Sequence, residues 1–201
     1  RNWFYTGLNE VTGIVTRWLD KIFVLYLLSA ADFAVFYNGA FEIPLFAVLI
    51  SAMENVMLSN ISGELSNKSE AKNIFRESFK VLALVAFPVF FFFLFTHEEA
   101  YSFIFNDKYN ASIPVFLISI FILPLRITHY GVILQCYGKA HKLVLGSIMD
   151  ILLSLGLMFA LYPSMGTRGV VLALVISTYL QVCYYLFHSA KTLGMKITDL
   201  V

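Results

Sequence analysis

Eight ionisable residues lie within stretches of this sequence that are otherwise apolar. They are Arg17, Asp20, Lys21, Glu42, Glu54, Arg126, His129 and Asp150. A charged side chain inside a membrane is costly unless it faces a partner or a water-filled cavity. Arginine presents a planar set of donors that matches phosphate, and a carboxylate can balance an arginine or bind a proton or cation. We therefore interpret these residues as the lining of a hydrated inner cavity that accepts an anionic group.

The first group, Arg17, Asp20 and Lys21, has the spacing i, i+3, i+4, which places the three side chains on one helical face. Two interpretations remain open. Arg17 and Lys21 extend to the cytoplasmic headgroups while Asp20 pairs with Arg17, or the three side chains turn into the cavity. Glu54 is either neutral or paired with a basic residue of the first segment.

Arg126 stands near the middle of an apolar segment, two residues after Pro124. This position favours a water-filled cavity over a purely structural role. Asp150 has Ser147 and Ser154 three and four residues away, so the three residues form a polar stripe on an apolar helix.

The composition indicates which solvent surrounds these residues. Of the 201 residues, 59% are hydrophobic and 13% are charged, and the mean hydropathy is +0.78. Ordinary soluble domains have about 25% charged residues, and a soluble protein of this length needs more polar residues to cover its surface. The net charge of +1 comes with no basic stripe for nucleic acid, and Cys136 and Cys183 lack the paired spacing of a disulfide framework or metal site.

The sequence therefore predicts an all-α polytopic membrane protein, with residues 1–201 forming a single helical bundle. A membrane-spanning helix needs about 20 mostly apolar residues. Six such segments are predicted, at about 11–31, 33–62, 79–96, 113–137, 143–162 and 169–187. Pro44, Pro88 and Pro124 fall inside three of them and predict kinks.

Basic residues predict the orientation, because lysine and arginine concentrate in cytoplasmic loops. The loops after the second and fourth segments and the tail after the sixth contain Lys68, Lys72, Arg76, Lys80, Lys139, Lys142, Lys191 and Lys196. The opposite loops contain only Lys108 and Arg168. Both ends of the chain are thus expected in the cytoplasm. Residues 64–80 are either an amphipathic helix on the membrane surface or a cytoplasmic extension of the third segment.

Several motifs resemble one family when they are taken in order. These are Asp20-Lys21-Ile22, the stretch FAVFYNGAFEIPLFAVLISAM at 33–53, the basic loop SNKSEAKNIFRESFK at 66–80, GKAHK at 138–142 and YPSMGTRGVVLALVIS at 162–177. They resemble polysaccharide-biosynthesis flippases, the Wzx-type branch of the multidrug/oligosaccharidyl-lipid/polysaccharide exporter superfamily. Val170 and Val171 stand where small residues are more usual in that family.

The resemblance implies that these helices are the later part of a MATE-like transporter of twelve to fourteen helices, with the first half missing. The implied activity is the flipping of an undecaprenyl-diphosphate-linked oligosaccharide, such as an O-antigen unit, across the bacterial inner membrane. A proton or sodium ion would drive this step, and glycosyltransferases and a polysaccharide polymerase would be partners. No cofactor is implied.

On this interpretation, Arg17, Lys21 and Arg126 attract the diphosphate, while Asp20, Asp150 and Glu54 balance charge or couple an ion. Two alternatives remain. A cation-coupled drug antiporter of the same fold would have mainly acidic and aromatic residues in its cavity. A membrane polymerase or acyltransferase would need catalytic groups in an outer loop, where His97, Glu98, Glu99 and Asp107 form no recognised motif.

Overall fold

The computed structural model describes residues 2–27, 29–40, 44–63, 67–105 and 107–200. Within these ranges the chain is almost entirely helical and contains no β-strand. The elements in chain order are α1 (Asn2–Leu27), α2 (Ala30–Gly39), α3 (Pro44–Gly63), α4 (Lys68–Phe105), η1 (Asp107–Ser112), α5 (Ile113–Ser119), η2 (Ile120–Leu125), α6 (Val132–Cys136), α7 (Ala140–Met165), α8 (Thr167–Leu193) and α9 (Ile197–Leu200).

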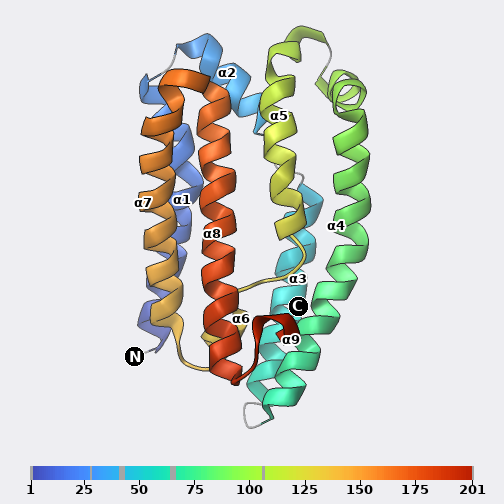
Figure 1. The fold of residues 1–201 in the computed structure, drawn as a ribbon, viewed down its shortest axis with the longest axis vertical. Coiled ribbons are helices and arrows are strands. Elements are labelled where there is room, and N and C mark those ends of the chain that lie inside the picture. Colours follow the sequence, from blue (N-terminus) through green and yellow to red (C-terminus); the bar gives the residue numbers. More distant parts are fainter. Residues whose placement is uncertain (1, 28, 41–43, 64–66, 106, 201) are drawn as a thin grey trace.

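The long helices run up and down one bundle, and their connections alternate between its two ends (Figure 1). The turns from α1 to α2, from α4 to α5 and from α7 to α8 lie at one end. The start of α4, the turn from α6 to α7 and the C-terminal α9 lie at the other. The basic loops of the sequence therefore gather at a single end of the bundle.

Four helical stretches in the described ranges are long and apolar enough to cross a membrane, and they lie in α3, α4, α7 and α8. The helix α1 also has the length, but it contains Glu10, Arg17, Asp20 and Lys21 and is not among the four. The predicted second segment is divided into α2 and α3, with residues 41–43 outside the described ranges. The all-α polytopic membrane fold predicted from composition is confirmed.

The helix α4 shows how sequence spacing sets the packing. Its buried side chains recur every three or four residues, which is the repeat of one helical face. These residues are Ala71, Phe75, Ser78, Leu82, Ala86 and Phe90. Leu84 and Phe95 on other faces are each 77% exposed, as expected for side chains that contact lipid. Because α4 begins at Lys68 and continues without interruption into the apolar stretch, residues 68–80 extend the membrane-spanning helix.

The helices α7 and α8 form a close antiparallel pair joined by a tight turn at Gly166, whose φ of 57° favours glycine. At Gly169, a Cβ atom would lie 2.6 Å from the carbonyl oxygen of Leu161. The absence of a side chain at Gly169 therefore lets the two backbones approach closely.

The helix α5 lies between two hydrophobic clusters and is fixed by both. Phe116 packs into a cluster formed mainly by α3, α4 and η2, whereas its neighbour Val115 packs into one formed mainly by α1, α2, α7 and α8. Because α5 is packed on both sides, its C-terminal end has a fixed position in the bundle. The chain continues into η2 from that point.

The predicted fourth segment, 113–137, is not one continuous helix as the apolar run suggests. It consists of α5, η2, a non-helical stretch at residues 126–131 and the short helix α6. Pro124 explains part of this break, because proline has no amide hydrogen to continue the helical ladder. By contrast, α4 stays helical at Pro88 and departs from helical φ and ψ only at Thr96, and Pro44 is the first residue of α3.

Candidate functional site

The non-helical stretch at residues 126–131, which we call the break, lies inside the bundle rather than at either end (Figure 1). Arg126 ends η2 with φ −84° and ψ 31°, and its amide donates to the carbonyl oxygen of Leu123 at 2.8 Å. Irregular backbone at membrane depth is tolerated only where protein or a water-filled cavity satisfies the freed polar groups. The break is therefore expected to have partners from neighbouring helices.

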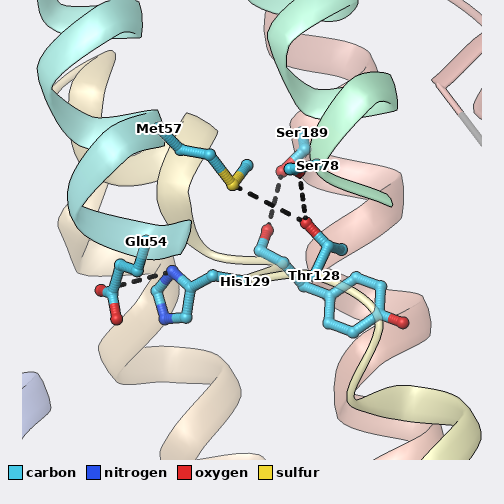
Figure 2. Close-up of polar contacts among 7 residues, drawn as sticks. Glu54, Met57, Ser78, Thr128, His129 and Ser189 are labelled. Atoms are coloured by element: carbon cyan, nitrogen blue, oxygen red, sulfur yellow. Dashed lines mark hydrogen bonds and ion pairs between the residues drawn. The ribbon is translucent and has the colours of Figure 1, made fainter. Parts of the chain in front are cut away.

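Side chains of three helices contact the break, and one of them binds its backbone (Figure 2). The hydroxyl groups of Thr128 and Ser78 of α4 are 3.1 Å apart, and the Thr128 hydroxyl also lies 3.9 Å from the sulfur of Met57 on α3. The Ser189 hydroxyl of α8 donates to the carbonyl oxygen of Tyr130 at 3.4 Å. The break is thus tied to α3, α4 and α8.

An ionisable pair adds to the link with α3. The Nδ1 atom of His129 lies 3.4 Å from the Oε1 atom of Glu54, and both side chains are about one-third exposed (Figure 2). The sequence left Glu54 either neutral or paired with a basic residue of the first segment. The structure places it beside His129 of the break instead, where a protonated imidazole would balance its charge.

A cavity of about 410 Å³ opens beside the break. Residues of the break form one wall, and α1, α3, α7 and α8 also contribute to the lining. Its polar and charged lining residues are Lys21, Arg126, Thr128, His129, Tyr130, Asp150, Thr178, Gln181 and Tyr185. A volume of this size suits a small ligand or a headgroup, and the polar lining indicates a hydrated interior.

Both signs of charge are present in the cavity. Lys21 comes from α1, and its ammonium group lies 5.3 Å from the centre of the Trp18 ring, a cation–π distance. Asp150 comes from α7 and is only 4% exposed. The Asp150 Oδ1 atom has no hydrogen-bond partner among the described residues. A buried carboxylate oxygen without a partner is unfavourable, so this atom is available to a proton or cation.

Polar side chains on α7 and α8 surround Asp150. Ser177 lies beside the carboxylate on the facing helix. One turn along α7, the Ser147 hydroxyl is 3.2 Å from the hydroxyl of Tyr185, which donates to the carbonyl oxygen of Leu143 at 3.0 Å. The stripe of Ser147, Asp150 and Ser154 predicted from sequence is therefore buried against α8.

The structure brings three of the six predicted site residues to one place, because Lys21, Arg126 and Asp150 line the same cavity. Glu54 contacts His129, which also lines it. The side chains of Arg17 and Asp20 lie outside the described residues, although the backbone of both belongs to α1. Glu42 lies wholly outside the described ranges.

Sequence reasoning missed the uncharged polar part of the lining, which comprises Thr128, Tyr130, Thr178, Gln181 and Tyr185. A signal was present for two of them. Thr178 and Gln181 are three residues apart in the apolar sixth segment, so they share a helical face. No group of three potential metal ligands occurs in the described part of the chain.

The fold and this polar interior define an all-α membrane protein that crosses the bilayer several times. A family model described as polysaccharide biosynthesis protein matches residues 4–114, which is more than half of the chain. The chain belongs to this family of polysaccharide biosynthesis proteins. The match includes α1 to α4 and ends before the break.

The search of curated proteins finds no match to the chain. The search of solved structures likewise finds none.

Proposed function

We propose that this protein transports a lipid-diphosphate-linked oligosaccharide across the cytoplasmic membrane of a bacterium, as a flippase and not as an enzyme. Membership of the polysaccharide biosynthesis family supports a role in building a surface glycan. The polar cavity among membrane-spanning helices supports transport, because a charged headgroup needs a hydrated path through hydrocarbon.

This proposal rests on the position of Arg126, which follows a broken helix and lines the cavity. The break presents Arg126 to a cavity that also contains Lys21. Two cations in a confined polar space attract a diphosphate, and the guanidinium group can bind two phosphate oxygens at once. Discontinuous helices form substrate sites in other membrane transporters for the same reason.

In this proposal Lys21 and Arg126 receive the diphosphate, with Arg17 as a third cation on the same helical face as Lys21. Asp150, Glu54 and Asp20 balance these charges, and Asp150 is the carboxylate that binds a coupling proton or sodium ion. The end of the bundle that carries the basic loops faces the cytoplasm. Among the residues that line the cavity, the two cations Lys21 and Arg126 outnumber the single carboxylate Asp150, which favours this activity over a cation-coupled drug antiporter.

The test replaces Arg126→Gln and Lys21→Gln separately in the full-length protein and measures export of surface polysaccharide in cells. Each change keeps a polar side chain but removes the charge. We expect export to fall at least about tenfold for Arg126→Gln, because loss of one charge-assisted contact is worth about 1.5–3 kcal/mol. Arg168→Gln is the matched control. Arg168 is exposed in the first turn of α8, at the end of the bundle away from the basic loops.

Protein amount in the membrane is measured in parallel by immunoblotting. Normal export by both variants at normal protein level would overturn the cationic-cavity assignment. A second measurement replaces Cys136 and Cys183 with Ala, introduces Cys at position 126, and tests labelling by a water-soluble maleimide. A sulfhydryl at position 126 that no condition exposes to the reagent would contradict a hydrated cavity.

A further inference from the structure

A second group of basic side chains gathers where α7 begins and α8 ends, away from Lys21 and Arg126. We call this group the α7–α8 basic cluster, and it consists of Lys139, His141, Lys142, His188 and Lys191. All five residues lie at the end of the bundle that carries the basic loops (Figure 1). The cluster is assembled by the α7–α8 packing, because its members come from sequence positions about 50 residues apart.

Hydrogen bonds hold two of the three lysines of the cluster, Lys139 and Lys142, in place. The Lys142 ammonium group lies 2.8 Å from the Nδ1 atom of His188, and an ammonium group can only donate, so the ring nitrogen accepts. The Lys139 ammonium group donates to the Thr192 hydroxyl at 3.1 Å, and that hydroxyl donates to the carbonyl oxygen of His188 at 2.7 Å. The lysines are thus anchored near one another.

The basic side chains of the cluster repel one another. Lys139 and Lys191 lie close enough to Lys142 for their charges to act on it, and like charges repel. The first turn of α7 contains no acidic residue. Acidic residues are the favoured ones there, because the helix dipole places positive charge at that end. A bound anion would relieve the repulsion.

Exposed apolar stripes lead from the cluster into the membrane-spanning part of both helices. On α7, His141 is followed at helical spacing by Leu145, Ile148 and Leu152, which are 50%, 42% and 66% exposed. On α8, Lys191 is preceded at helical spacing by Phe187 and Leu180, which are 52% and 49% exposed. Each stripe therefore has a basic residue at its end and apolar side chains at membrane depth.

We propose that the α7–α8 basic cluster binds the phosphate group of an anionic phospholipid whose acyl chains lie along these two stripes. The combination favours a phospholipid over a soluble anion, because a soluble anion has no use for apolar surface beside its site. Lysine and arginine side chains near the membrane surface attract the anionic lipids of the cytoplasmic leaflet. The proposal does not depend on transport, since it uses neither Lys21 nor Arg126.

The test uses purified full-length protein in detergent and native mass spectrometry, with dioleoyl phosphatidylglycerol and dioleoyl phosphatidylcholine as probes. We expect the protein to bind the glycerol lipid at least about tenfold more tightly than the choline lipid. The triple variant Lys139→Gln, Lys142→Gln, Lys191→Gln should lose this preference. The matched control is Lys68→Gln, Lys72→Gln, Lys80→Gln, which removes the same charge from α4 at the same end of the bundle.

A third variant, in which the three cluster lysines become arginine, keeps the charge and should keep the preference even if the glutamine variant fails to fold. Equal binding of the two lipids by the native protein would overturn the proposal, as would an equal loss in the control variant. Displacement of the glycerol lipid by 10 mM inorganic phosphate, but not by 10 mM chloride, would also overturn it, because the site would then take any phosphate. The lipid measurements use purified protein and do not depend on export of surface polysaccharide. The proposals of flipping and of phospholipid binding can therefore fail separately.

Discussion

The helix pair α7–α8 and the break at residues 126–131 differ in how their backbone polar groups find hydrogen-bond partners. Both lie among membrane-spanning helices, where backbone groups cannot use water as a partner. In α7 and α8 the intrahelical ladder satisfies the backbone, and the pair packs so closely that Gly169 has no room for a side chain. In the break the ladder stops. The Ser189 hydroxyl group of α8 donates to one carbonyl oxygen of the break, that of Tyr130, and Ser78 of α4 contacts the Thr128 side chain.

The difference explains where a binding site can form. A regular helix presents only side chains to its surroundings, whereas a broken helix also turns backbone and adjacent side chains toward the interior. In this protein the break supplies Arg126, Thr128 and His129 to the cavity wall, and the regular pair supplies Asp150 and Gln181. Tight packing in one region and polar contacts in the other thus hold two parts of the lining of one cavity.

The largest expected effect comes from disturbing the tight pair. In Gly169→Val the new Cβ atom would overlap the Leu161 carbonyl group, and backbone cannot move aside as a side chain can. We expect a loss of about 3 kcal/mol in the free energy of unfolding, measured by denaturant titration in detergent micelles. Gly156→Val on α7 is the control, because no atom lies within 4 Å of a Cβ built there. Equal losses in the two variants would mean that α7 and α8 are not in close contact at Gly169.

A smaller loss of stability is expected from removing one side-chain hydrogen bond that holds the break. Thr128→Val keeps the side-chain shape but removes the hydroxyl group shared with Ser78, and both residues are buried. We expect a loss of about 1–2 kcal/mol, because the Ser78 hydroxyl loses its contact with the break. The control is Thr178→Val on α8, whose hydroxyl group bonds only to the Leu174 carbonyl of its own helix among the described contacts; it should lose about 0.5 kcal/mol or less.

A double-mutant cycle separates this tether from general destabilisation. If Ser78→Ala and Thr128→Val act through their shared hydrogen bond, the double variant is less destabilised than the sum of the two single losses. Strictly additive losses would show that the two hydroxyl groups are not coupled, and the contact between Ser78 and Thr128 would then not help to hold the break.

The smallest effect is expected from the ionisable pair. Glu54 and His129 are each about one-third exposed, so water screens their interaction, and the coupling energy should be about 0.2–1 kcal/mol. The measurement is a double-mutant cycle of Glu54→Gln and His129→Gln at a pH near 5.5, where an ordinary histidine is protonated. The exposed Glu77 of α4 provides the reference: Glu77→Gln combined with His129→Gln should show no coupling. A coupling energy as large as that of Ser78 with Thr128 would show that the ionisable pair is not the weaker of the two tethers.

The sequence predicted the fold class, most of the long helices and the alternation of basic and non-basic connections. Each of these follows from local quantities, namely the apolar content of a segment and the charge of a loop. The break was not predicted, although Pro124 marked its position. Pro88 lies in an equally apolar run, yet α4 stays helical there and is kinked only at Thr96, so a proline in the sequence does not distinguish a continuous stretch of helix from a broken one. Packing by neighbouring helices makes that distinction.

The same division applies to the site. Because ionisable residues are rare at membrane depth, the sequence alone singled out six functional candidates, of which Lys21, Arg126, Asp150 and Glu54 have described side chains. Only the tertiary structure decided that the first three line one cavity and that Glu54 lies beside His129. The physical reason is that hydrophobicity acts along a segment and is readable residue by residue. Which polar groups face one another depends instead on how four or five helices pack together.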